Sequence, residues 1–182
     1  MARAIFSVGH SNTSLEDFLA RLAQQAIAGL ADVRAYPASR RHPHFGREAL
    51  AAACTARGID YRWLPGLGGR RKGVADSPHL AWREPGFRAY ADYMDTPEFL
   101  AARAELEAMA RGVRTAFLCA EALWWQCHRR LIADSLLVAG WDVRHIASDG
   151  SVHPHALPEF ARVIGERIVY DRGITPPLSS RL

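Results

Sequence analysis

The chain has 182 residues, 49% of them hydrophobic and 23% charged, with a formal net charge of +4, which is the composition of one globular domain. Its apolar runs are far shorter than the roughly 20 residues of a membrane-spanning helix, and the first residues lead straight into a strand pattern without a signal peptide. Three cysteines do not indicate a disulfide framework, so we expect a cytoplasmic protein.

Basic residues are concentrated between residues 34 and 72. Lys72 is the only lysine of the chain, and all other basic side chains are arginines. A guanidinium binds phosphate through a planar pair of N–H groups, so this surplus favours an anionic partner. A solvated basic face is the alternative, and both interpretations stay open. The basic residues of this segment are Arg34, Arg40, Arg41, Arg47, Arg57, Arg62, Arg70, Arg71 and Lys72.

The hydrophobic pattern predicts strands that alternate with helices. In chain order, the first expected elements are a strand at residues 4–8, a helix after the capping box Thr13-x-x-Glu16, a strand at 29–33, a helix at 47–57 and a strand at 59–64. A long loop rich in glycine and proline follows, over residues 65–86. Loops of this length in compact domains are commonly functional.

The second half continues the alternation and ends differently. Its expected elements are a helix at 87–94, a helix from the start signal Thr96-Pro97-Glu98 to Arg111, a strand at 113–118, a helix at 125–139, a strand at 141–146 and an amphipathic helix at 158–168.

This order predicts an α/β fold, with a mainly parallel sheet of about five strands and helices on both faces. We expect one domain over residues 1–155, with residues 156–182 forming a C-terminal helix and tail packed on it or extending from it. In a parallel sheet, the segments after each strand meet at one edge. The polar residues that follow the strands should therefore share one crevice.

The stretch from Cys119 to Arg130 is the densest group of reactive side chains in the chain. It contains two thiols, a carboxylate, an imidazole and two guanidiniums at an expected switch from strand to helix. Open α/β proteins build their sites at such switches.

Three other segments carry polar residues to the same expected edge. Together the segments are Val8-Gly9-His10-Ser11, Asp32-Val33-Arg34 with Pro37 and Ser39, Leu67-Gly68-Gly69-Arg70, and Cys119-Ala120-Glu121 with Cys127-His128-Arg129. In this order, over about residues 4–150, they resemble the signature of the domain of unknown function 488 family. That family is uncharacterised, so the resemblance implies a fold and the location of a site but no reaction. Its spacer before Cys127 is more polar, whereas Ala122 to Gln126 here predict a bulkier lid or an aromatic stacking surface.

Cys127 is the best candidate nucleophile. Its expected place at a helix N-terminus, beside Arg129 and Arg130, favours a thiolate, and His128 is a candidate base. Adjacent helical residues diverge by about 100 degrees, however, which opposes a direct pair between Cys127 and His128. The alternative is that Cys119 and Cys127 only pack, as we expect of Cys54 in its alanine-rich helix.

A metal site is a second interpretation of the same donors, Cys119, Cys127 and His128, with His10 or His145 as further candidates. The gap between the two cysteines is longer than the spacing of about two to four residues in structural zinc sites, so we assign no metal ligands. The triplets His42-Pro43-His44 and His153-Pro154-His155 are interpreted as surface histidines.

Asp32 and Glu121 form a possible pair of catalytic carboxylates. Two acids at one edge can divide the acid and nucleophile roles, as in glycosyl transfer. Pairing of each acid with a nearby arginine is the alternative, because Asp32 and Arg34 share one face of an extended strand.

The loop from Leu67 to Gly73 is a candidate anion site. Its glycines let backbone N–H groups approach an anion that Arg70 and Arg71 would neutralise, but it matches no nucleotide fingerprint. Tyr36, Trp63, Trp82, Trp124 and Trp125 offer stacking surfaces for bases or pack in the core.

The leading hypothesis is a hydrolase or glycosyl-transfer enzyme that acts on a phosphate-bearing substrate, either a nucleotide or a nucleic acid. The expected catalytic residues are Asp32, Glu121, Cys127 and His10, and the expected anion-binding residues are Arg34, Ser39, Arg70, Arg71, His128 and Arg129. The cofactor is left unassigned. A non-enzymatic nucleic-acid-binding module and a metal or redox-thiol protein that uses Cys119, Cys127 and His128 remain alternatives.

Overall fold

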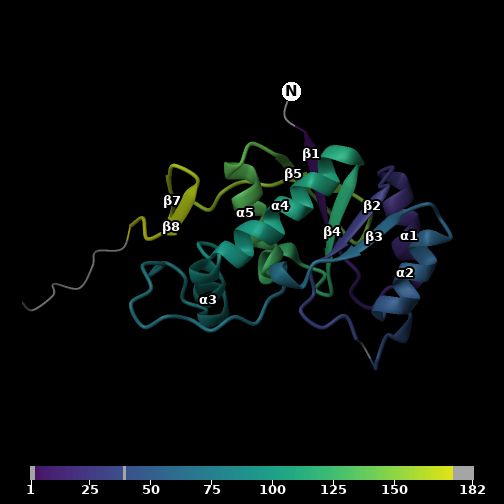
Figure 1. Ribbon diagram of the computed structural model, residues 1–182, viewed down its shortest axis with the longest axis horizontal. Helices are drawn as coiled ribbons and strands as arrows, with labels where there is room; N and C mark the ends of the chain where they lie inside the picture. Colours follow the sequence, from purple (N-terminus) through teal and green to yellow (C-terminus); the bar gives the residue numbers. More distant parts are fainter. Residues whose placement is uncertain (1–2, 39, 174–182) are drawn as a thin grey trace, which may run out of the picture.

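A six-stranded sheet forms the centre of the protein, which we describe from a computed structural model covering residues 3–38 and 40–173 (Figure 1). The strand order is β3-β2-β4-β1-β5-β6. The strands are β1 (Ala4–Gly9), β2 (Gly29–Asp32), β3 (Asp60–Trp63), β4 (Thr115–Cys119), β5 (Asp142–Ile146) and β6 (Val152–Pro154). The first five pair in parallel, and β6 joins β5 as an antiparallel edge strand. The predicted mainly parallel α/β sheet is confirmed.

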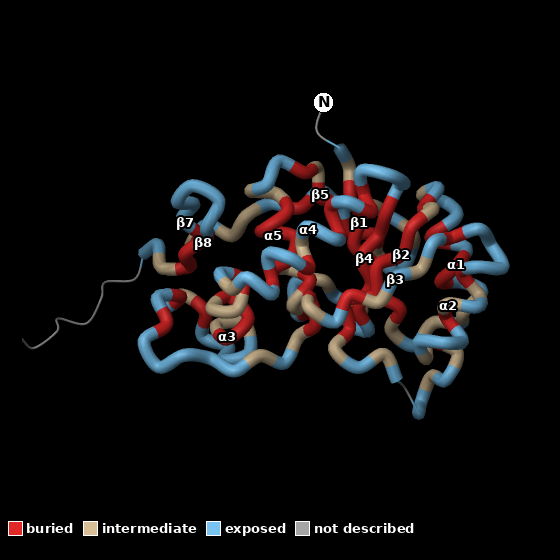
Figure 2. The backbone as a smooth tube through the Cα atoms, in the orientation of Figure 1, coloured by how far each residue is buried: buried red, intermediate tan, exposed pale blue. Residues whose placement is uncertain are grey.

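Helices cover both faces of the sheet. They are α1 (Leu15–Gln24), α2 (Arg47–Thr55), α3 (Pro85–Tyr93), α4 (Pro97–Gly112) and α5 (Arg129–Val138). The buried side chains form two clusters, one between the sheet and α1 with α2, the other between the sheet and α3, α4 and α5. Successive residues of β1 belong to opposite clusters: Ile5 packs on the α4–α5 side and Phe6 on the α1–α2 side. Figure 2 shows the buried sheet between its exposed helix surfaces.

Two helix starts differ from their predictions. The cap of α1 is Ser14, whose Oγ accepts from the Asp17 amide at 3.0 Å, while the Thr13 hydroxyl donates to the His10 carbonyl. Helix α5 begins at Arg129 because residues 124–126 form a separate 3₁₀ turn, η3 (Trp124–Gln126). Cys127 therefore precedes the helix instead of lying in its first turns.

The C-terminal segment is a hairpin, so the prediction of a helix over residues 158–168 is wrong. Strands β7 (Ala161–Ile164) and β8 (Arg167–Tyr170) pair antiparallel across a two-residue turn in which Gly165 has a φ of +62°. β-branched residues such as Val163 and Ile168 fit strands better than helices. The tail after residue 173 lies outside the described residues. No helix in the described part of the chain is long and apolar enough to cross a membrane.

Candidate functional site

A cleft of about 280 Å³ opens where β2 and β4 end, at the carboxyl edge of the sheet. It is lined by the segment after β2, the loop after η2 (Pro65–Leu67) and the turn between β4 and α5. Of the expected site residues, the cleft brings together Arg34, Arg70, Glu121, Cys127 and His128. Glu121 and Arg34 therefore line the same cavity.

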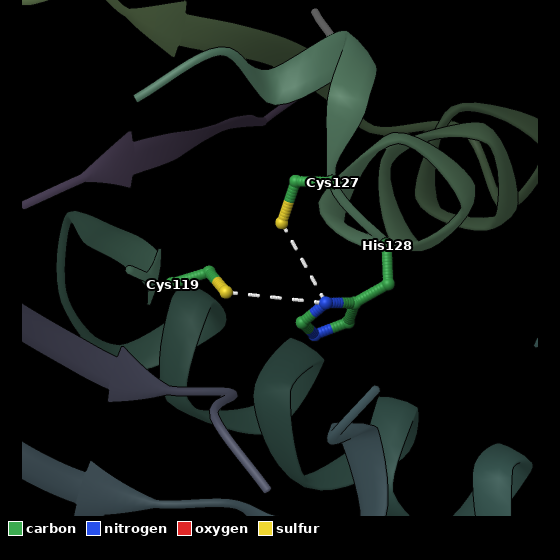
Figure 3. A group of neighbouring side chains, drawn as sticks. All are labelled: Cys119, Cys127 and His128. Carbon is green, nitrogen blue, oxygen red and sulfur yellow. Dashed lines mark hydrogen bonds between the residues drawn. The ribbon is translucent and has the colours of Figure 1, made fainter. Parts of the chain in front are cut away.

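Two thiols and an imidazole converge in the wall of this cleft (Figure 3). Nδ1 of His128 lies 3.6 Å from Sγ of Cys127 and 3.9 Å from Sγ of Cys119. All three donor atoms lie within 4.8 Å of one another. The expected divergence of Cys127 and His128 is wrong because it assumed a helix, whereas both residues precede the first turn of α5.

The backbone orients the His128 ring. Its Nε2 donates to the carbonyl of Val33 at 3.0 Å, so in the neutral ring the lone pair of Nδ1 points at the two sulfur atoms. Gly69 packs against the other side of the ring, where an added Cβ would lie 3.1 Å from Nδ1. The ring is thus held for interaction with the thiols.

The two thiols have opposite acidities. The pKa of Cys127 lies well below its usual value, mainly because Cys119 donates a hydrogen bond to its sulfur, with further stabilisation from His128 and Arg129. The pKa of Cys119 lies well above its usual value, because of that same hydrogen bond and burial. When the pair carries a single negative charge, that charge therefore lies on Cys127.

Arg129 supplies positive charge behind the thiols and does not line the cleft. Its side chain is buried, and Nη2 donates to the backbone carbonyl of Glu121 at 2.5 Å. Its Nε has no hydrogen-bond partner, and among the described residues no carboxylate lies within ion-pair distance of it. A buried guanidinium without a carboxylate stabilises a nearby anion, and Arg129 in this way lowers the pKa of Cys127.

A buried chain of hydrogen bonds anchors Arg129 from the opposite side. Nη1 of Arg129 contacts the Ser7 hydroxyl at 3.4 Å, and this hydroxyl lies 2.9 Å from Nδ1 of His145. The chain continues from His145 to His155 at 3.0 Å and ends at Asp134, which His155 contacts at 2.8 Å. When both imidazole rings are neutral, each group in the chain donates to the next one, from the Arg129 guanidinium to the Asp134 carboxylate.

This relay of Ser7, His145, His155 and Asp134 was missed by the sequence reasoning, apart from His145. The interpretation of His155 as a surface residue is wrong, because its imidazole is fully buried. Two signals were available: a serine inside the apolar strand β1, and Asp134 among buried residues of α5.

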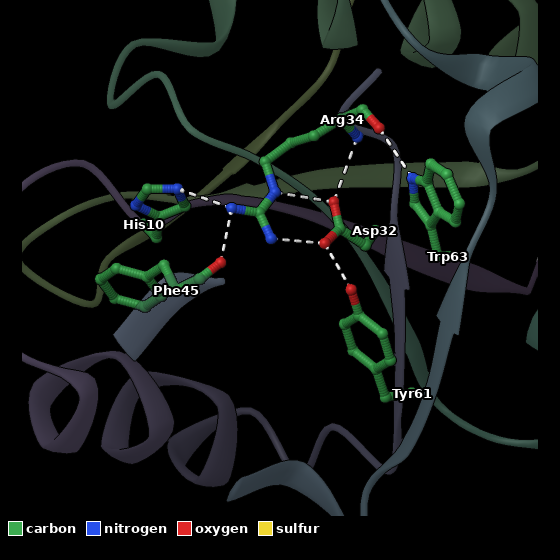
Figure 4. A network of polar contacts seen from close by, with 6 residues as sticks. All are labelled: His10, Asp32, Arg34, Phe45, Tyr61 and Trp63. Carbon is green, nitrogen blue, oxygen red and sulfur yellow. Dashed lines mark hydrogen bonds and ion pairs between the residues drawn. The ribbon is translucent and has the colours of Figure 1, made fainter. Parts of the chain in front are cut away.

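Asp32 and Arg34 form a buried ion pair (Figure 4). Nε and Nη2 of Arg34 donate to the two carboxylate oxygens at 2.8 and 2.5 Å, and the Tyr61 hydroxyl donates to Oδ2 at 2.6 Å. Asp32 is fully buried and does not line the cleft. Asp32 therefore pairs with an arginine, which was the alternative to a catalytic role. Asp32 and Glu121 do not form a pair of carboxylates in the cleft.

His10 lies beneath Arg34, also outside the cleft lining. Its Nδ1 donates to the Ser11 carbonyl at 2.8 Å, and its Nε2 accepts from Nη1 of Arg34 at 3.3 Å. The ring stacks on Phe45 with a centroid distance of 4.1 Å. Burial lowers the pKa of His10 to about 4, so the ring is neutral and helps to hold Arg34 in place.

The two arginines of the loop from Leu67 to Gly73 point in different directions. Arg70 is exposed, lines the cleft and has a φ of +63°, a strained backbone conformation that is often found at functional sites. Arg71 turns away: it donates to the Gly68 carbonyl at 2.9 Å and lies over the Tyr93 ring at 3.7 Å. Of the other candidates, Glu121 is exposed at the cleft, and Ser39 lies outside the described residues.

The spacer tryptophans support the turn between β4 and α5. Trp124 stacks on His145 at a centroid distance of 3.9 Å with parallel rings, so it packs against the relay. Trp125 is exposed, with 46% of its surface accessible. The predicted aromatic stacking surface is thus occupied at Trp124 by a side chain of the protein, His145.

Comparison with known proteins identifies the family. Neither the curated proteins nor the solved structures give a match. The family described as "Domain of unknown function DUF488" matches residues 14–136, more than half of the chain. This match includes the Asp32–Arg34 ion pair at the end of β2, the loop of residues 67–73 and both cysteines of the cleft. The chain therefore belongs to the DUF488 family.

Proposed function

We propose that the cleft is the active site of a hydrolase that acts on a phosphate-bearing substrate, with the Cys127 thiolate as its nucleophile. The observation that carries the proposal is the position of the Cys127 thiol, whose sulfur lies 3.6 Å from Nδ1 of His128 and near a buried Arg129 that has no carboxylate partner among the described residues. Reactive cysteines occur in such electropositive surroundings.

The thiolate forms before the substrate binds, as the Cys127 proton passes to Nδ1 of His128. The resulting imidazolium donates to the Val33 carbonyl and to the thiolate, which lie at the two ring nitrogens. Arg70, which is exposed and lines the cleft, binds the anionic substrate.

The thiolate then attacks the phosphorus atom. An S–P bond forms while the P–O bond to the leaving group breaks, and the carboxylic acid of Glu121 gives its proton to the leaving oxygen. Water attacks the same phosphorus atom, returns a proton to Glu121 and releases phosphate as the S–P bond breaks. The thiolate is regenerated, so no external oxidant or reductant is needed. The thiols must stay reduced, which fits a cytoplasmic setting.

Hydrolysis through a thiolate has more support than glycosyl transfer between two carboxylates. Arg34 and Tyr61 occupy both oxygens of Asp32. Glu121 is the acid left at the cleft, and it suits proton transfer.

Turnover of a panel of nucleotides, single-stranded oligonucleotides and simple phosphate esters tests the proposal. We expect Cys127→Ser to reduce turnover at least about 100-fold while Cys54→Ser, at a buried thiol in the α1–α2 core, retains it. Equal turnover by the wild type and Cys127→Ser contradicts the proposal. Salt-dependent nucleic-acid binding without turnover, unchanged in Cys127→Ser, would instead indicate the non-enzymatic binding module.

A metal centre is the second candidate, because the donor spacing also suits it. A tetrahedral zinc ion with Zn–S of about 2.3 Å and Zn–N of about 2.0–2.1 Å separates sulfur from nitrogen by about 3.6 Å. The observed separations from His128 are 3.6 and 3.9 Å. The Val33 carbonyl would orient the ring, as outer partners of metal-binding histidines do.

Cobalt titration separates the two candidates. The metal centre predicts stoichiometric binding of Co²⁺ with thiolate-to-cobalt absorption that Cys119→Ser abolishes, and turnover that a chelator stops. The thiolate enzyme predicts turnover that a chelator leaves unchanged.

A further inference from the structure

A second hollow of about 560 Å³ adjoins the cleft. Ala35 and Tyr36 line both cavities, so one ligand can reach from the cleft into this groove. The remaining walls come from the loop after β2, the start of α2 and the end of β3, and they include Pro37, Arg47 and Trp63. The volume falls in the range of about 300–1,000 Å³ that is typical of small-molecule sites.

Two aromatic side chains line the groove. Tyr36 is 74% exposed, so the core does not use its ring. The loop that carries Tyr36 is tied down nonetheless, because the Arg47 amide donates to the Pro37 carbonyl at 2.9 Å. Trp63 is anchored by its Nε1, which donates to the Arg34 carbonyl at 2.9 Å. The groove thus presents flat aromatic surfaces from fixed supports.

The charged groups of the groove suit a nucleotide. The Arg47 guanidinium lies over the Trp63 ring at 4.7 Å from its centroid, and exposed Arg40 and Arg41 belong to the same loop. Glu48 also lines the groove and can accept a hydrogen bond from the amino group of a base. Arg70 stands at the adjoining cleft. A ligand with an aromatic ring at one end and an anion at the other complements both hollows.

We infer that the groove binds the base of a nucleotide whose phosphate lies in the neighbouring cleft. The inference rests on the proposed function and names its substrate class: a nucleoside monophosphate, either free or at the end of a single strand. The base stacks on Tyr36 and Trp63, and Arg70 binds the phosphate.

Binding to the Cys127→Ser protein tests this inference without interference from turnover. The probes are the four nucleoside monophosphates, adenosine, inorganic phosphate and a 5′-phosphorylated hexa-adenylate, followed by calorimetry. Stacking of one base is worth about 1–3 kcal/mol, so Tyr36→Ala should weaken binding of the best nucleotide by about 5- to 150-fold. Tyr36→Phe keeps the ring and should retain the affinity, whereas Arg70→Ala should weaken nucleotide and phosphate alike.

Trp125→Ala is the matched control, because Trp125 is an exposed aromatic residue that lines neither cavity. Tighter binding of the hexa-adenylate than of the free nucleotide assigns the strand end, and the reverse assigns the mononucleotide. Failure of every nucleotide probe to bind at millimolar concentration, or equal affinity in Tyr36→Ala, overturns the inference. Loss of binding in Tyr36→Ala, together with turnover that survives Cys127→Ser, would retain the nucleotide site and reject the thiolate mechanism.

Discussion

Burial decides what one local sequence pattern does in this protein. An aspartate followed two residues later by an arginine forms an ion pair at the end of β2, within β3 and within β5, since two such side chains lie on one face of an extended segment. The Asp32–Arg34 pair is 0% and 7% exposed at its side chains, and the Asp60–Arg62 pair is 46% and 56% exposed. Pairing was predictable from the spacing, but the burial of only one of these two pairs required the sheet order.

Removing the charge of Asp32 should therefore be costly. Asp32→Asn leaves a buried Arg34 without its partner, and we expect the free energy of unfolding to fall by about 3–5 kcal/mol. Asp60→Asn changes the same kind of pair at the surface and should cost at most about 1 kcal/mol. Urea unfolding of both variants measures the difference, and equal losses would show that burial does not set the strength of the pair.

The turn between β4 and α5 shows what helix prediction could and could not provide. The strand-to-helix switch at Cys119 was predicted, and so was the importance of Cys127 and His128. The start of α5 was placed too early, because the stacking of Trp124 on His145 depends on a residue of another strand. The late start lets Cys127 and His128 approach one another at 3.6 Å.

The relay connects this turn with the C-terminal hairpin through Tyr170, whose hydroxyl donates to Asp134 at 2.7 Å. Tyr170→Phe leaves one buried oxygen of Asp134 without that donor, so we expect a loss of about 1–3 kcal/mol in unfolding free energy. Tyr36→Phe removes the same atom from an exposed ring and should change stability by less than about 0.5 kcal/mol. A Tyr170→Phe protein as stable as the wild type in urea would speak against a structural role for the relay.

At the scale of the whole molecule, alternation of strands and helices was enough to predict the parallel sheet and the shared edge. The hairpin β7–β8 was not predicted, because its short apolar segments fit either period and its stability depends on packing against α5 and Trp82. The buried relay could not be predicted either, because its members come from β1, β5, α5 and the segment after β6. Such long-range polar contacts leave little local pattern in a sequence.

Buried neutral histidines should make the whole fold sensitive to mild acid. Burial lowers the pKa of His10 to about 4 and that of His145 to about 2, both below the unfolded value of about 6.5. Below pH 6.5 these two histidines bind protons in the unfolded chain but stay neutral in the folded protein. The free energy of unfolding that is present at neutral pH is therefore lost as the pH falls. Each histidine should contribute a slope of up to about 1.4 kcal/mol per pH unit.

Urea unfolding at pH 7, 6 and 5 measures this slope. Replacing His10 with Asn should reduce the slope, whereas His153→Gln, at an exposed position, should leave it unchanged. A free energy of unfolding that stays constant from pH 7 to pH 5 would contradict the neutral state of the buried rings.

Thiolate absorbance near 240 nm as a function of pH tests the central claim most directly. We predict that the chelator-treated wild type already carries one thiolate at pH 7, that acid removes it, and that Cys54→Ser retains it, because burial raises the pKa of Cys54 to about 11. Cys127→Ser should abolish this signal, and Cys119→Ala should raise the pKa of Cys127 because it removes the hydrogen-bond donor. An absorbance step that begins only above pH 8, or one that persists in Cys127→Ser, would contradict the account.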